Sequence, residues 1–165
     1  MVKVKLVDFI ACIGCETCEK VCEYLHKRPR VRLFSTIGGI LIPITCMHCA
    51  RPACMEACLT GAIFKDESGA VRVAENRCIG CKLCTFACPF SVPEIDPVTH
   101  VMTKCDLCLE RRLEGLEPAC SEICPAGVIF YGDYEEIFHR VKSKAAEMLA
   151  RAKIFAESSK KELEI

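Results

Sequence analysis

The sequence predicts an α+β protein built from two copies of one cysteine-rich unit, with short β-hairpins and a C-terminal helix. Three observations lead to this fold class. Sixteen cysteines form four groups of four, a shift of 66 residues places the first half on the second, and residues 133–165 contain no Cys, Gly or Pro. We therefore expect a domain at residues 1–132, with repeats at about 3–66 and 67–132, and a helical extension at 133–165.

The cysteines form four quartets with none left over. In chain order these are Cys12, Cys15, Cys18 and Cys22; Cys46, Cys49, Cys54 and Cys58; Cys78, Cys81, Cys84 and Cys88; and Cys105, Cys108, Cys120 and Cys124. The third quartet, followed by Pro89, has the spacing C-x2-C-x2-C-x3-C-P of bacterial ferredoxins. In that pattern three thiolates on one loop bind one [4Fe–4S] cluster, and the fourth binds a second cluster nearby. We predict four [4Fe–4S] clusters on a duplicated bacterial-ferredoxin-like fold.

The duplication is visible at the level of single residues. The shift of 66 places residues 12–15 on 78–81 and residues 52–61 on 118–127. Cys105 and Cys108 depart from it, since they lie seven residues earlier than the shift requires. The second copy is therefore expected to contain a longer loop at 109–118.

Between the quartets the chain is strand-prone and short. Residues 31–44, interrupted by Gly38 and Gly39, predict one hairpin, and residues 62–65 and 70–73 predict another around the turn 66–69. Gly61 and Gly127 are expected to adopt a positive φ. Such a unit offers little apolar core, so the clusters are expected to form much of it, and iron removal should unfold the protein.

Residues 133–165 predict one amphipathic helix. Tyr134, Val141, Met148 and Phe155 recur every seven residues, and Phe138, Ala145 and Ala152 lie between them. Two interpretations remain open, namely a helix that packs on its own domain and an arm that docks on a partner subunit.

Other uses of so many cysteines fit the sequence less well. A secreted disulfide protein would need a signal peptide, and residues 1–8 contain neither an apolar core segment nor twin arginines. Structural zinc usually takes two C-x2-C pairs per ion. No apolar stretch approaches the ~20 residues of a membrane span. We therefore expect a soluble, cytoplasmic protein with no direct membrane span.

The formal net charge of zero counts every Cys as neutral. A [4Fe–4S] core with four thiolates carries about −2, so four would bring the protein to roughly −8. The chain has no Gln and one Asn, a composition typical of thermophiles.

Other motifs do not indicate a second activity. G-x-G-x-x-G and G-x-x-x-x-G-K-[ST] are absent, so we expect no NAD, flavin or ATP site. His48 lies between two cysteines of a complete quartet, so we expect its ring near the cluster sulfurs or in simple packing. For His26, His100 and His139 we expect surface or hydrogen-bonded roles. The basic clusters 27–32 and 111–112 predict solvated faces, charge balance or an acidic partner, and not nucleic-acid binding.

With the quartets placed, the sequence resembles the four-cluster iron–sulfur subunits of the dimethyl sulfoxide reductase type over residues 3–133. The residues that carry the resemblance are the second quartet with Ala50, Arg51, Pro52, Gly61 and Ala62, the run Lys104-Cys105-Asp106-Leu107-Cys108, and Gly115, Pro118, Cys120, Cys124, Pro125, Gly132 and Asp133. Leu59 and Glu23 depart from the pattern, because the family often has Pro after the fourth Cys.

The resemblance implies that the first quartet pairs with the fourth and the second with the third. The implied ligand sets are Cys12, Cys15, Cys18 and Cys124; Cys105, Cys108, Cys120 and Cys22; Cys46, Cys49, Cys54 and Cys88; and Cys78, Cys81, Cys84 and Cys58. The duplication alone would equally allow the first quartet to pair with the second.

A cluster with four Cys ligands has no open iron site and suits one-electron transfer. The resemblance implies a non-catalytic subunit that relays electrons between a large tungsto- or molybdopterin oxidoreductase subunit and an acceptor such as ferredoxin. Aldehyde:ferredoxin oxidoreductase and formate dehydrogenase complexes contain similar subunits. A linker of a nickel hydrogenase or carbon monoxide dehydrogenase is one alternative. A structural or redox-sensing metal-binding module is another, from a different class.

Overall fold

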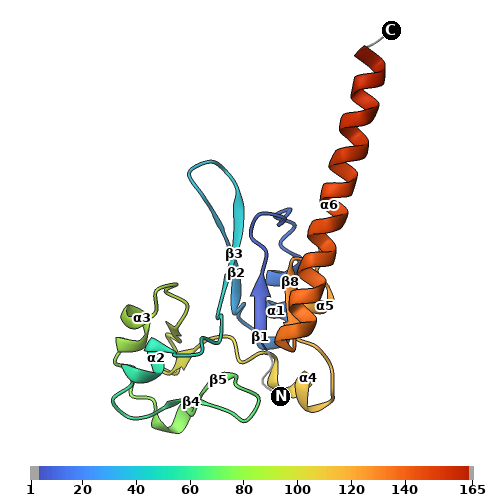
Figure 1. Cartoon of the computed structure of the whole chain (residues 1–165). Helices are drawn as coiled ribbons and strands as arrows, with labels where there is room; N and C mark the ends of the chain where they lie inside the picture. The colour runs from blue at the N-terminus through green and yellow to red at the C-terminus, as the bar shows by residue number, and fades with distance from the viewer. Residues whose placement is uncertain (1–3, 164–165) are drawn as a thin grey trace. The chain divides into compact units, whose positions relative to one another are not determined.

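The computed structural model describes residues 4–163 of the chain, and the side-chain environments of residues 5–153 (Figure 1). The chain forms two compact units, residues 1–131 and 132–165. The elements are β1 (Val4–Val7), α1 (Thr17–His26), β2 (Val31–Ser35), β3 (Leu41–Thr45), α2 (Ala53–Glu56), β4 (Ile63–Lys65), β5 (Val71–Val73), the 3-10 turn η1 (Glu75–Arg77), α3 (Leu83–Ala87), β6 (Glu94–Ile95), β7 (Met102–Thr103), α4 (Leu109–Leu113), α5 (Ala119–Glu122), β8 (Ile129–Gly132) and α6 (Tyr134–Leu163). The predicted α+β fold with short hairpins and a C-terminal helix is confirmed.

Both predicted hairpins form. Strands β2 and β3 pair antiparallel from Val31 opposite Thr45 to Ser35 opposite Leu41, and they extend away from the rest of the first unit (Figure 1). Strands β4 and β5 pair antiparallel around the turn at residues 66–69. Gly61 and Gly127 have φ of 61° and 57°, as predicted.

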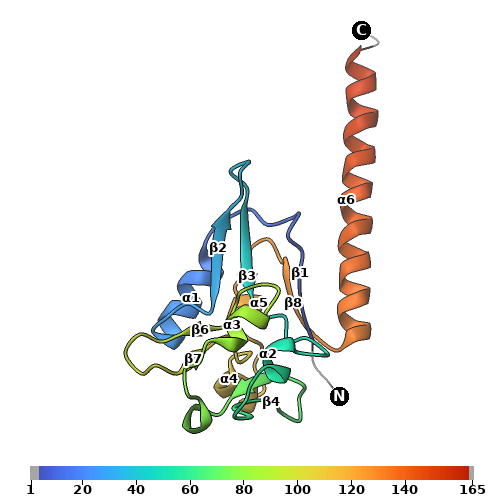
Figure 2. The ribbon, with the colours of Figure 1, turned by 90° about the vertical axis from the view of Figure 1, so that its left-hand side faces the viewer.

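Two further strand pairs were not predicted. Strands β6 and β7, of two residues each, are too short to show a periodic pattern. Strand β1 pairs with β8, more than 120 residues further along the chain, and the two lie side by side in both views (Figures 1 and 2). A local pattern cannot reveal such a distant pairing.

The secondary structure repeats at the offset found in the sequence. A shift of 66 residues carries α2 onto α5, the start of α1 onto the start of α3, and β4 onto β8. The same shift carries β1 onto β5. Because β1 pairs with β8 and β5 pairs with β4, each of these sheets takes one strand from each repeat, and the two repeats interlock.

Cysteines form a large part of the buried core of the first unit. One group of buried residues joins Val7, Val31, Val128 and Ile129 to Cys18, Cys22 and Cys120. A second joins Ile63, Val71 and Met102 to Cys54 and Cys84, and a third joins Leu107 and Tyr131 to Cys105. Apolar residues therefore gather around the thiols instead of forming a separate core.

The second unit is dominated by α6. The rings of Tyr134 and Phe138 stack at a centroid distance of 6.1 Å, and Lys142 Nζ lies 4.2 Å from the Phe138 ring centre. The side chain of Phe155, part of the predicted apolar stripe, lies outside the described residues. Within the described part of the chain, no helix has both the length and the apolar character needed to cross a bilayer.

Candidate metal centres

The sixteen cysteines line four hollows in the first unit, four cysteines to each. Hollow I contains Cys12, Cys15, Cys18 and Cys124; hollow II contains Cys22, Cys105, Cys108 and Cys120; hollow III contains Cys46, Cys49, Cys54 and Cys88; and hollow IV contains Cys58, Cys78, Cys81 and Cys84. The structure thus brings together the same sets of four that the family resemblance implied. It does not bring the first quartet together with the second, the alternative that the duplication allowed.

The local backbone explains why three cysteines of a quartet face one hollow and the fourth another. In hollow IV, Cys78 and Cys81 precede α3 and Cys84 lies in its first turn. Lys82, at the start of that helix, has a φ of 65° and turns the loop around the hollow. The helix ends at Cys88, which has extended backbone angles before Pro89 and faces hollow III.

Shared elements place the hollows next to one another in the order I, II, III, IV. Helix α1 carries Cys18 of hollow I and Cys22 of hollow II, Lys5 of hollow II donates to Thr45 directly before Cys46 of hollow III, and α3 carries Cys84 of hollow IV and is followed by Cys88 of hollow III. Burial raises the pKa of the Cys18 thiol to about 12, and negative charge on Cys120 of hollow II contributes. Burial also raises the pKa of Cys54 in hollow III to about 11, with a contribution from Cys84 of hollow IV. Charge on Cys105 of hollow II acts on Cys46 of hollow III in the same direction. Neighbouring hollows are therefore close enough for their thiolates to repel each other.

Several backbone amides point at cysteine sulfurs. The N–H groups of Arg30, Met102, Leu107 and Val128 donate to the Sγ atoms of Cys22, Cys78, Cys105 and Cys124 over distances of 3.1, 3.3, 3.4 and 3.5 Å. Such donors stabilise thiolates and help to set the reduction potential of a bound cluster. Burial raises the pKa of six of the buried thiols, so a bound cation is needed to keep them ionised; these are Cys18, Cys22, Cys54, Cys84, Cys108 and Cys120.

The spacing of the thiols fits a cluster better than a single ion. Four thiolates around one zinc ion must converge to about 2.3 Å from its centre. Among residues 4–163, no three His, Cys, Asp or Glu side chains are grouped closely enough to hold one metal ion. The four cysteines of each hollow instead line its wall from different sides and do not converge on one point. This arrangement suits a group of several atoms with a ligand at each corner.

Two buried lysines lie beside the cysteines, and the sequence reasoning missed them. Lys5 Nζ donates to Thr45 Oγ1 at 2.8 Å and to Cys105 Sγ at 3.8 Å. Burial lowers the pKa of Lys5, but the surrounding thiolates outweigh burial and hold the pKa above its ordinary value. Lys104 Nζ donates to Cys46 Sγ at 3.7 Å, to the Cys105 carbonyl at 2.9 Å and to the Val71 carbonyl. Both ammonium groups are therefore held next to thiolates.

Two histidines also lie beside cysteines. The Nδ1 atom of buried His48 accepts a hydrogen bond from Val71 N at 3.0 Å, which places the ring proton on Nε2. Burial raises the pKa of Cys46, but contact with His48 and Lys104 outweighs it and lowers the pKa. His48 thus lies near the sulfurs, as expected. His26 has a hydrogen-bonded role, since its Nε2 lies 3.5 Å from Cys108 Sγ.

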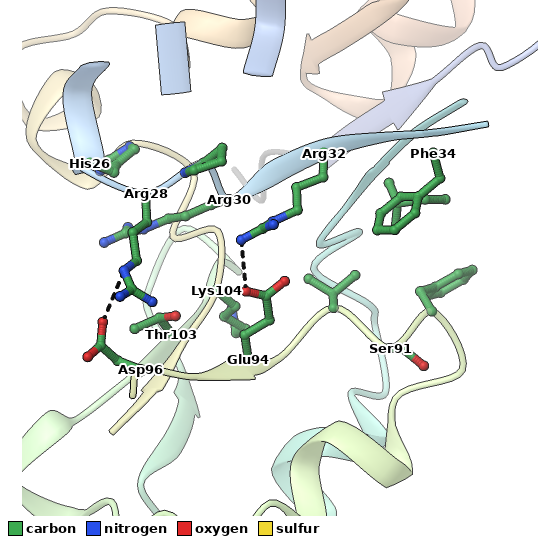
Figure 3. Close-up of a pocket in the computed structure, with 14 residues that line it drawn as sticks. His26, Arg28, Arg30, Arg32, Phe34, Ser91, Glu94, Asp96, Thr103 and Lys104 are labelled. Atoms are coloured by element: carbon green, nitrogen blue, oxygen red, sulfur yellow. Dashed lines mark hydrogen bonds and ion pairs between the residues drawn. The ribbon is translucent and has the colours of Figure 1, made fainter. Parts of the chain in front are cut away.

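The basic clusters are paired with acidic groups and carbonyls. Arg28 pairs with Asp96 at 3.4 Å and Arg32 pairs with Glu94 at 3.2 Å. These side chains face each other in a cleft of about 320 Å³ (Figure 3). The prediction of a solvated face was wrong for Arg112. Its side chain is only 8% exposed and donates to Ser68, to Asp66 and to the carbonyls of Leu107 and Asp106. Arg112 therefore ties the loop that carries Cys105 and Cys108 to the β4–β5 turn.

Comparison with known proteins decides the family. Residues 38–134 match the family model described as a 4Fe-4S dicluster domain. The chain therefore belongs to this family. It is 37% identical to the B subunit of the anaerobic dimethyl sulfoxide reductase of Escherichia coli (strain K12), over 79% of this chain and 73% of that protein. It is 36% identical to thiosulfate reductase electron transfer subunit PhsB of Salmonella typhi, over 81% of this chain and 77% of that protein.

A third relative is the formate dehydrogenase-O iron-sulfur subunit of Escherichia coli (strain K12), at 31% identity over 89% of this chain and 58% of that protein. The predicted resemblance to iron–sulfur subunits of the dimethyl sulfoxide reductase type is confirmed, and so is the prediction of [4Fe–4S] cofactors. This 4Fe-4S dicluster protein is an iron–sulfur electron-transfer subunit.

Proposed function

We propose that the chain holds four [4Fe–4S] clusters, one in each hollow, and conducts electrons along the row from hollow I to hollow IV. The observation that carries this proposal is the division of sixteen cysteines into four adjacent sets of four. The proposed ligands are the cysteines of hollows I to IV as given above.

The residues of the chain support electron transfer and not substrate conversion. When bound, a [4Fe–4S] cluster gains or loses one electron. Four thiolates per hollow leave no iron position open to a substrate. Apolar side chains such as Leu33 and Val128 in hollow I and Met102 in hollow IV limit the access of water. Backbone N–H donors stabilise the thiolates in both redox states.

The proposed partner is a large catalytic tungsto- or molybdopterin oxidoreductase subunit, with soluble ferredoxin as the external acceptor. The relatives support an oxidoreductase complex, because they are named as parts of dimethyl sulfoxide reductase, thiosulfate reductase and formate dehydrogenase. Cysteines used as ligands favour a reducing compartment, and we propose the cytoplasm. The lack of Gln supports a thermophilic source, for which a holoprotein Tm above about 90 °C is the test.

Anaerobic elemental analysis tests the cofactors and the partner together. The tagged chain, purified gently with whatever binds it, should contain about sixteen irons and sixteen sulfides per chain. Tungsten or molybdenum alongside iron supports the proposed partner, whereas nickel without either would favour a hydrogenase or carbon monoxide dehydrogenase. A colourless protein that contains zinc would contradict the proposal.

A pair of variants tests the ligand sets. Cys120 and Cys124 belong to one quartet in the sequence but line hollows II and I. Cys120→Ala and Cys124→Ala should each lose about four irons and remove different centres from the electron paramagnetic resonance spectrum. Loss of the same centre in both variants would contradict the proposed sets.

A further inference from the structure

The junction between hollows II and III carries two buried positive charges. Lys5 lines hollow II and Lys104 lines hollow III. Their side chains are held in the core, with the residues only 5% and 6% exposed. Burying an ammonium group without a counter-charge is costly, so a buried lysine needs an anionic partner. Here the nearest anionic groups are cysteine thiolates of the two inner hollows.

Each of the two lysines contacts a cysteine of a different inner hollow. Lys5 reaches Cys105 Sγ of hollow II, and Lys104 reaches Cys46 Sγ of hollow III. This is also the junction between the two halves of the row, because hollows I and II take their cysteines from the first and fourth quartets and hollows III and IV from the second and third. The positive charges therefore lie where the two halves meet.

The two ammonium groups occupy equivalent places in the two repeats, although the two lysines are not equivalent residues of the repeat. The counterpart of Lys5 under the shift of 66 is Val71, whereas Lys104 directly precedes Cys105 as Thr45 directly precedes Cys46. Lys5 Nζ donates to Thr45, and Lys104 Nζ donates to the Val71 carbonyl. The pairs Lys5–Thr45 and Val71–Lys104 are therefore equivalent in the repeat, and each contains one lysine. In the first pair the lysine is the residue on the strand, and in the second it is the residue directly before the cysteine. The two sites share the charge although they do not share the residue that supplies it.

The outer hollows lack this arrangement. Among the described residues that line hollows I and IV, the only basic one is Lys82 in hollow IV, and it is exposed to solvent. Water screens an exposed charge far more strongly than a buried one. The electrostatic environment of the inner hollows therefore differs from that of the outer ones.

We propose that the ammonium groups of Lys5 and Lys104 raise the reduction potentials of the two inner clusters, and so favour electron transfer across the junction between the halves. This inference rests on the proposed function. Adding one electron makes a cluster more negative, so a fixed positive charge at short distance stabilises the reduced form more than the oxidised form. No bond forms or breaks, the proton stays on Nζ, and the electron passes on to the next cluster.

Redox titration of the anaerobic holoprotein, followed by electron paramagnetic resonance, tests the inference. Lys5→Met and Lys104→Met remove the charge and keep an apolar side chain of similar length. Each should shift the midpoint of one inner cluster to more negative values, by a tenfold or greater change in the reduction equilibrium, or about 59 mV for one electron. The double variant should shift the midpoints of both inner clusters. Lys5→Arg and Lys104→Arg keep the positive charge, so they should leave both midpoints close to those of the unmodified protein.

Lys20→Met is the matched control, since this lysine lies on α1 between Cys18 and Cys22, lines none of the four hollows and has a side chain that is 70% exposed. It should move no midpoint by more than a small fraction of the shift at Lys5. Unchanged midpoints in the Lys5 and Lys104 variants, or equal shifts of all four centres, would overturn the inference while leaving the four-cluster function intact. Fewer than four clusters in the unmodified protein would instead refute the proposed function.

Should the Met variants lose iron, Lys5→Gln and Lys104→Gln keep a hydrogen-bond donor without the charge. Negative midpoint shifts in the Gln variants would support the inference. The inference would be overturned if the Gln variants also lose iron and every lysine variant that keeps its iron has unaltered midpoints. The lysines would then serve folding alone.

Discussion

Replacing Arg112 by Met should make the holoprotein lose its clusters much faster under denaturing conditions. The Arg112 Nε donates to the Leu107 carbonyl at 2.9 Å, and its two Nη groups donate to Ser68, to the Asp106 carbonyl and to Asp66. Met fills similar space but leaves these acceptors without their donor. The loop that carries two ligands of hollow II then loses its link to the β4–β5 turn.

The contacts set the expected size of the effect. Removing one partner of a buried ion pair costs about 3–5 kcal/mol. The Asp66 side chain is 16% exposed and keeps its bonds to Ser68 N and Ala70 N, so we expect the lower end, about 3 kcal/mol. Because 1.36 kcal/mol corresponds to a factor of ten, unfolding should accelerate by about 150-fold if the network is broken in the transition state.

Arg111→Met is the matched control on the same helix. Arg111 donates to the Glu117 carbonyl at 2.9 Å and pairs with Glu122, whose side chain is 58% exposed. An exposed pair and one hydrogen bond contribute about 1 kcal/mol together, or roughly a fivefold change in rate.

The assay follows the loss of absorbance near ~400 nm at a fixed guanidinium concentration without oxygen. A rate is the appropriate quantity, because cluster release makes unfolding irreversible. Equal rates in the two variants would refute the reasoning, since Arg112 would then act as an ordinary surface arginine.

Three further perturbations have defined outcomes. Gly80 lies between Cys78 and Cys81 with a φ of 66°, and the Cβ of Gly80→Ala would lie 2.5 Å from the His100 carbonyl oxygen. The ligand loop must then shift, so about four irons should be lost from hollow IV. A full iron content would contradict this. Burial raises the pKa of Asp66, but hydrogen bonds from Ser68 and Ala70 and the charge of Arg112 outweigh burial and lower the pKa. Ionised Asp66 therefore stabilises the fold above about pH 4. This stability is lost as the pH falls through the lowered pKa. Asp66→Asn should therefore unfold faster at neutral pH and depend less on pH below about 4, and a parallel pH profile would contradict this. Anaerobic chelation of iron should abolish the circular dichroism of the first unit, and a retained spectrum would show a core that is independent of metal.

Local spacing predicted much of the site because it acts over few residues. Cys78, Cys81 and Cys84 lie within seven positions, so one loop and one helical turn must bring them together. The hairpins at β2–β3 and β4–β5 followed from strand-prone runs around turn residues for the same reason. Gly61 likewise showed its positive φ through its residue type alone.

Long-range contacts were beyond such patterns. Arg112 had the appearance of a surface residue in a short basic pair, yet its donors reach Asp66, 46 positions away. His26 lies 82 positions from Cys108. Neither contact changes the local sequence in a recognisable way, because arginine is mostly exposed in proteins and histidine is often partly exposed.

Cysteine count, spacing and the 66-residue repeat indicated a duplicated [4Fe–4S] protein, because all three can be read from the chain without knowing how it folds. Spacing alone left open which quartets share a hollow and gave no sign of Lys5, whereas the fold places Cys22 with Cys105 and Lys5 beside them. A duplicated chain is nearly symmetric, so its spacing allows more than one pairing of quartets. The interlocking of β1 with β8 and of β4 with β5 removes that ambiguity, because each sheet joins one repeat to the other.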